Sequence, residues 1–75
     1  MNDTLQTMEL VYADLLQADQ LMEGDIVLHN GEHVEVKDIA ASDTGWRIAI
    51  VNDFGEEDEF EMTDDEMIRL YVYVE

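Results

Sequence analysis

The segment DIVLHNGEHVEV, residues 25–36, constrains the fold of this chain more than any other. Two runs in which apolar and polar residues alternate flank the pair Asn30-Gly31. This pair supplies the two positive-φ positions that a tight type I′ turn requires, so the segment predicts a β-hairpin. A two-residue turn places Val27 opposite Val34, and both side chains are then expected on the core side of the hairpin.

Further alternating runs follow the hairpin. Residues 46–51 and 67–74 alternate clearly, and residues 59–63 form a shorter run. Ile39 breaks the alternation of the hairpin, which predicts a β-bulge near residues 37–38. Short strands at close spacing without proline predict a mainly β protein: a small curled antiparallel sheet or barrel of five to six strands. The predicted inward side chains include Trp46, Ile48, Ile50, Phe60, Met62, Ile68, Leu70, Val72 and Val74.

The N-terminal segment has a less definite pattern. Apolar side chains recur at helical spacing after Asp3, which can cap a helix with Gln6 three residues later, yet ELVYADLLQ also reads as a strand. We predict a short helix or a tail over residues 1–14 that runs into a strand near residues 15–18. The whole chain, residues 1–75, is then one small domain with its β-barrel over residues 15–75. The residues at helical spacing are Leu5, Met8, Tyr12, Leu15 and Leu16.

Several kinds of chemistry lack their usual residues. The chain has no cysteine and one serine, and 75 residues are too few to enclose a deep cleft, so we expect no enzyme and no catalytic residue. On the hairpin, His29 and His33 fall on opposite faces and cannot share a metal. The acidic residues also lack the spacing of a calcium loop, so no metal or other cofactor is expected.

The expected location follows from other absences. The first ten residues, MNDTLQTMEL, lack the basic and apolar stretches of a signal peptide. No run approaches the roughly 18 apolar residues of a membrane span. The lack of cysteine suits a reducing compartment. We therefore expect a soluble, cytoplasmic protein.

Charge limits the partners that the protein can bind. Twenty acidic residues against Lys37, Arg47 and Arg69 give a formal net charge of −17. Nucleic acids and anionic membranes would repel such a protein before any short-range contact formed. The expected partner is a basic protein, and a nucleic-acid-binding protein is one class of basic protein.

The acids are concentrated in GEEDEFEMTDDE, residues 55–66. If Phe60 and Met62 face inward on a strand, Glu59 and Glu61 face outward, and the adjacent turns add further carboxylates. The result is an acidic ridge. B-DNA as long as a globule of this size, about 29 Å, carries about 17 phosphates, so mimicry of nucleic acid is one interpretation. The ridge residues are Glu56, Glu57, Asp58, Glu59, Glu61, Asp64, Asp65 and Glu66.

Salt adaptation and solubility could each account for the acidity as well. A salt-adapted protein carries excess acid and little lysine, and acidity also keeps a small protein soluble and monomeric. Because crowding eight acids together costs stability that an even distribution would avoid, we favour a non-enzymatic acidic binding protein whose ridge contacts a basic protein surface.

Tyr71 and Tyr73 suggest an alternative function. Both fall on the face opposite the predicted core side of the last strand, where exposed tyrosines can anchor a partner. The N-terminal segment could instead cover them. If it does not, the protein is a structural or oligomerisation module that joins copies of itself through Tyr71, Tyr73 and the N-terminal segment.

The stretch LLQADQLMEGDIVLHNGEHVEVKDI, residues 15–39, resembles the opening of small SH3-like β-barrel proteins of actinobacteria and their phages. The resemblance implies an SH3-like barrel and a phage origin, with the host cytoplasm as the location. It carries no catalytic residues. The matching positions are Leu16, Ala18, Leu21, Gly24, Asp25, Val27, Gly31, Val34 and Val36.

Overall fold

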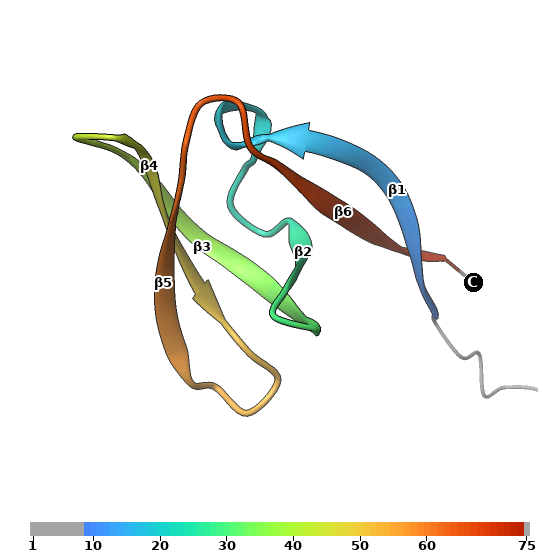
Figure 1. The fold of residues 1–75 in the computed structure, drawn as a ribbon. Coiled ribbons are helices and arrows are strands. Elements are labelled where there is room, and N and C mark those ends of the chain that lie inside the picture. Colours follow the sequence, from blue (N-terminus) through green and yellow to red (C-terminus); the bar gives the residue numbers. More distant parts are fainter. Residues whose placement is uncertain (1–8, 75) are drawn as a thin grey trace, which may run out of the picture.

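A computed structural model describes residues 9–74, which form one antiparallel sheet of six strands and a single turn of 3-10 helix (Figure 1). The strand order is β1-β6-β2-β3-β4-β5, so β1 and β5 are the two edges and the sheet is not closed into a barrel. The prediction of a mainly β, small curled antiparallel sheet is confirmed. The elements are β1 (Glu9–Gln17), η1 (Ala18–Gln20), β2 (Ile26–His29), β3 (Glu32–Ser42), β4 (Gly45–Val51), β5 (Glu57–Met62) and β6 (Met67–Val74).

The hairpin of β2 and β3 has the predicted register. Val27 lies opposite Val34, and His29 lies opposite Glu32. Asn30 and Gly31 have φ values of 52° and 81°, the positive values that a two-residue turn of this kind needs. The local sequence therefore specified both the turn and the pairing.

The sheet curls strongly. The predicted bulge is present between Val36 and Asp38 of β3, and β1 has a second one between Tyr12 and Asp14. Strands β2 and β5 are three positions apart in the sheet, a separation of about 14 Å if the sheet were flat. His29 of β2 and Phe60 of β5 nevertheless have their rings stacked, with centroids 4.0 Å apart. The curl thus closes one face of the sheet around its own side chains.

The core fills this concave face. Val27, Val36 and Ile48 are its largest fully buried side chains, and η1 with the residue after it adds Ala18 and Leu21. Buried apolar side chains of this number suit a small single domain. The full core is Ala18, Leu21, Val27, Val34, Val36, Ile48, Ile50, Met62 and Ile68, with Leu16, Ile39, Trp46 and Phe60 packed against it.

Strand β6 leaves the core before its end. The prediction that Val72 and Val74 face inward is wrong, because their side chains are 41% and 40% exposed. Strand β2 pairs with β6 only at Leu70 and Tyr71. Beyond that point β6 pairs with β1 alone, and Figure 1 shows this two-stranded part running away from β3, β4 and β5.

The N-terminal helix prediction is wrong for residues 9–14, which belong to β1, and the alternative of a strand is correct. Without β1, strand β6 would itself be an edge of the sheet. Pairing with β6 satisfies backbone N–H and C=O groups of β1, and this tertiary contact outweighs a weak helical pattern in the sequence. Leu5 and Met8 lie outside the described residues. Nowhere in residues 9–74 is there a helix long and apolar enough to cross a membrane.

Gly45 lets the end of β5 approach β4 closely. A Cβ atom at this position would overlap the carbonyl oxygen of Met62 and would lie 2.9 Å from the Cα atom of Thr63. Both obstacles are backbone atoms, which cannot move aside as a flexible side chain can. Glycine is therefore required at position 45, where the β3–β4 hairpin meets the end of β5.

Candidate protein interaction surfaces

Strand β5, at one edge of the sheet, carries half of the predicted acidic ridge. Phe60 is half-buried and Met62 buried on the concave face, whereas Glu57, Glu59 and Glu61 are exposed, and the last two alternate with the inward side chains. Successive outward positions on a strand lie about 6.6 to 6.8 Å apart. All eight side chains of the acidic ridge are exposed: Glu56, Glu57, Asp58, Glu59, Glu61, Asp64, Asp65 and Glu66.

Arg47 of β4 lies across two of these carboxylates. Its Nε atom is 3.1 Å from Oε1 of Glu59, and its Nη2 atom is 3.4 Å from Oε2 of Glu61. Two neighbouring outward carboxylates of β5 therefore bind one guanidinium between them. These ion pairs are half exposed and contribute little to stability. The other acids of the ridge form no ion pair with another described residue.

The turn between β5 and β6 holds the last three acids in place. Asp64 accepts a hydrogen bond of 3.0 Å from the indole Nε1 of Trp46. Asp65 accepts one of 2.7 Å from the hydroxyl of Thr63, and Glu66 accepts one of 2.8 Å from the backbone N–H of Thr63. These acids therefore have structural roles that were not predicted, although a threonine followed by acids is typical of such turns.

The loop before β5 displays an aromatic ring. Oδ1 of Asn52 accepts hydrogen bonds of 2.9 Å from the N–H groups of Phe54 and Glu56. Its Nδ2 donates one of 2.8 Å to Oε1 of Glu56. The loop thus fixes its own shape, and yet the side chain of Phe54 is 88% exposed. Phe54 was not predicted as a surface residue, although Asn52 followed by Gly55 is a recognisable turn signal.

Three aspartates cover backbone groups of the strands. Asp14, Asp38 and Asp58 each accept a hydrogen bond from the N–H of the next residue, at 2.7, 2.9 and 2.8 Å. Asp14 and Asp38 do so at the two bulges, and Asp58 does so on the edge strand β5. Covered N–H groups and charged side chains both discourage another strand from adding to an edge. At the two edge strands, Asp14 and Asp58 therefore discourage pairing with another strand, whereas Asp38 lies on the interior strand β3.

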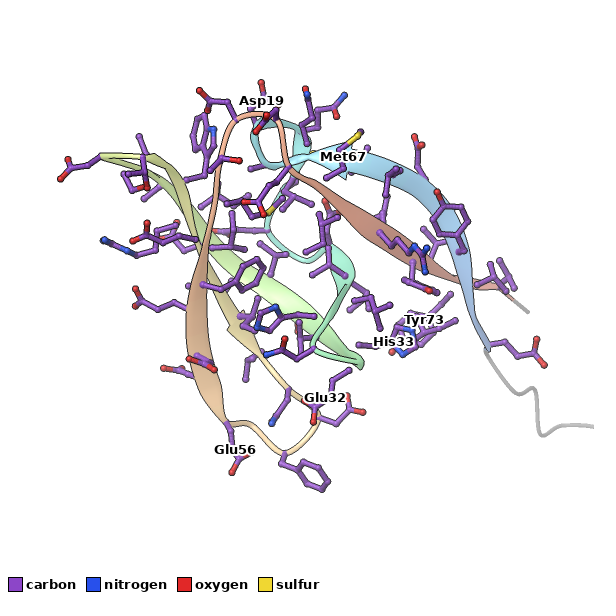
Figure 2. The ribbon with its side chains drawn as sticks, viewed as in Figure 1. Asp19, Glu32, His33, Glu56, Met67 and Tyr73 are labelled. Atoms are coloured by element: carbon purple, nitrogen blue, oxygen red, sulfur yellow. The ribbon has the colours of Figure 1, made fainter. Side chains whose placement is uncertain are left out.

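Tyr71 and Tyr73 lie on β6, which is four positions away from β5 in the strand order of the sheet. Tyr71 is half-buried between Tyr12, with ring centroids 6.0 Å apart, and His33, at 4.4 Å. Tyr73 is 52% exposed. Strand β1 thus lies beside β6 and shields Tyr71 in part, but it does not cover Tyr73. In the view of Figure 2, Tyr73 and His33 lie near each other and well apart from Glu56.

Strands β1 and β6, which we call the apolar ribbon, concentrate the exposed apolar side chains. Of the eight large apolar side chains exposed in residues 9–74, six lie on these two strands. The ribbon carries two acids and one arginine, a net charge of −1 in a chain of net charge −17. The structure therefore places the predicted site residues on two separate surfaces. The six side chains are Tyr12, Leu15, Met67, Val72, Tyr73 and Val74.

An open groove of about 390 Å³ lies between the ribbon and the Phe54 loop. Its lining includes Leu10, His33, Phe54 and Tyr73. His33 packs on Tyr71 while His29 stacks on Phe60, so the two histidines face opposite sides, as predicted. Within residues 9–74, no three side chains of the metal-binding types converge on one point.

Comparison of the chain with protein-family models, with curated proteins and with solved structures finds no match. The resemblance to SH3-like barrel proteins stays a prediction.

Proposed function

We propose that this protein is a non-enzymatic acidic binding protein whose acidic ridge docks on a basic protein surface. The observation that carries the proposal is Arg47, which spans Glu59 and Glu61 and illustrates how an arginine of a partner would be received by the exposed carboxylates beside it. An arginine fork matches carboxylates well because its N–H groups can serve two oxygens at once.

The arrangement of the ridge supports a nucleic-acid-binding protein as the partner. The outward acids Glu57, Glu59 and Glu61 of β5 lie about 6.6 to 6.8 Å apart along the strand, which is close to the spacing of every second phosphate along a DNA strand, at about 3.4 Å per phosphate. Hydrogen bonds fix the turn at each end of the strand. A pre-organised row of charges binds with less loss of side-chain freedom than a mobile acidic tail would. The ridge would then occupy the site where the partner holds nucleic acid.

The proposed place of action is the cytoplasm, which is the host cytoplasm if the chain is phage-encoded. Because long-range attraction steers the two molecules together, association should be fast at low salt and should slow as salt rises.

The test uses the full chain as bait in a cell extract across a salt series, with duplex DNA as competitor. We expect basic nucleic-acid-binding proteins to be retained, and to be released both by salt and by DNA. The triple variant Glu57→Gln, Glu59→Gln, Glu61→Gln should lose this retention. Glu61 accepts a hydrogen bond of 3.1 Å from the hydroxyl of Thr44 in the β3–β4 turn, and the amide oxygen of a glutamine can still accept it.

The matched control removes three charges elsewhere, with Glu9→Gln, Glu23→Gln and Glu32→Gln, which are all exposed. Equal loss of binding in both variants would show that net charge alone acts. Unchanged binding in the ridge variant would exclude the ridge from the interface.

A further inference from the structure

The apolar ribbon includes one edge strand of the sheet, β1. Among the described strands, Glu9–Tyr12, the part of β1 before its bulge, pairs with β6 on one side only. It has one charged residue, Glu9, and neither proline nor lysine to block pairing on its other side. The beginning of β1 pairs with the end of β6 beyond the reach of β2. Two strands alone are marginally stable in water, and here water reaches both of their faces.

Charge selects the edge through which two copies could meet. Pairing through β5 would place two acidic ridges against each other. Pairing through β1 brings together ribbons of net charge −1 each and keeps each acidic ridge at the far end of the sheet order. In a protein of net charge −17, pairing through the ribbon therefore meets less local repulsion than pairing through β5.

We propose that two copies pair antiparallel along β1 about a two-fold axis at Val11, which joins their sheets into one. A two-fold interface brings the same surface of each copy together. In this register Val11 lies opposite Val11 of the second copy, and Leu10 lies opposite Tyr12 on the outer face. Each pair keeps its apolar side chains on one face, as antiparallel pairing requires. The dimer does not use the acidic ridge and stands independently of the proposed function.

The first test is sedimentation of the full chain over a concentration series at low and high salt. We expect a monomer–dimer equilibrium in which added salt raises the dimer fraction, because salt screens the repulsion between two acidic copies. A monomer at every concentration and salt would overturn the proposal.

The second test changes one exposed side chain of the ribbon. Tyr12→Lys should weaken the dimer at least about tenfold, as expected when an aromatic side chain is lost from the centre of an interface. Met22→Lys is the matched control, because Met22 is 69% exposed outside the ribbon and the charge change is the same. Both variants lower the net negative charge, so a general charge effect would strengthen the dimer in both. Equal effects of the two variants would refute the pairing along β1.

The third test uses the lack of cysteine in the chain. Val11→Cys should form a disulfide-linked dimer under oxidised glutathione, since directly opposed residues on antiparallel strands lie within disulfide reach. Met22→Cys should remain largely unlinked under the same conditions. If the two variants cross-link equally, or if neither does, the proposed register is wrong. Circular dichroism of each variant checks that the fold is kept.

Discussion

The two edge strands of this sheet, β1 and β5, differ in how far they are protected against pairing with another chain. Strand β5 carries four acids in six residues, and Asp58 covers the N–H of Glu59. Strand β1 carries two acids in nine residues and exposes Tyr12 and Leu15; Asp14 covers the N–H of Leu15 there, but only after the bulge. An edge strand invites pairing with another chain unless charge or geometry prevents it. The contrast indicates that charge discourages strand pairing along β5, whereas the first half of β1 carries only Glu9 as a charged residue.

The difference arises from where the core ends. Phe60 and Met62 anchor β5 on the concave face, so its other side chains are free to carry charge. Within residues 9–74, no third strand lies beside the start of β1 and the end of β6, and the side chains of Val72, Tyr73 and Val74 are exposed there. Exposed apolar residues in such a place support the proposed pairing of two copies.

The largest expected effect tests where along β6 the core stops. Ile68→Ala should cost about 2 to 5 kcal/mol of unfolding free energy, because Ile68 is 8% exposed and its loss leaves a cavity. Val72→Ala, on the same face of the same strand, should cost well under half as much in the monomer. Urea denaturation of both variants at low concentration measures this. Equal costs would show that the ribbon is as well packed as the core.

A smaller effect is expected at the contact that holds the acidic edge. Gly45→Ala should cost about 2 to 3 kcal/mol, since its Cβ atom would push the end of β5 away from β4. Gly24→Ala is the control, because Gly24 also has a positive φ but no atom lies within 4 Å of the point that its Cβ would occupy. Its cost should be about 1 to 2 kcal/mol, from backbone strain alone. Thermal unfolding that ranks Gly24→Ala above Gly45→Ala would contradict the close approach.

The smallest expected effect compares two acids on β5 itself. Glu57→Gln should raise the unfolding free energy by a few tenths of a kcal/mol at low salt, because Glu57 has acidic neighbours and no ion pair among the described residues. Glu59→Gln should give a smaller gain or a loss, because it removes the negative charge of the 3.1 Å ion pair with Arg47. Both differences should fade in high salt. A loss of stability for Glu57→Gln would mean that its carboxylate has a favourable role.

Local signals in the sequence were enough for most of the strands and for the hairpin register. The pair Asn30-Gly31 and the break at Ile39 fixed a turn and a bulge, because each depends on the backbone of a few residues. The exposure of Val72 and the strand at residues 9–14 depend on which strands become neighbours, and alternation does not encode that. Alternation along the strand predicted that Glu59 and Glu61 point outward. The contact of Arg47 with both was not predicted, because it depends on β4 being the neighbour of β5.

The pairing of Glu9 with Val74 has a mechanical consequence. These two residues begin β1 and end β6, so a force that pulls them apart acts at one end of a ladder of backbone hydrogen bonds. The bonds would open one after another, like a zipper, and would not share the load as they do when strands slide past each other. The fold should therefore yield to a weak pull applied at these two points.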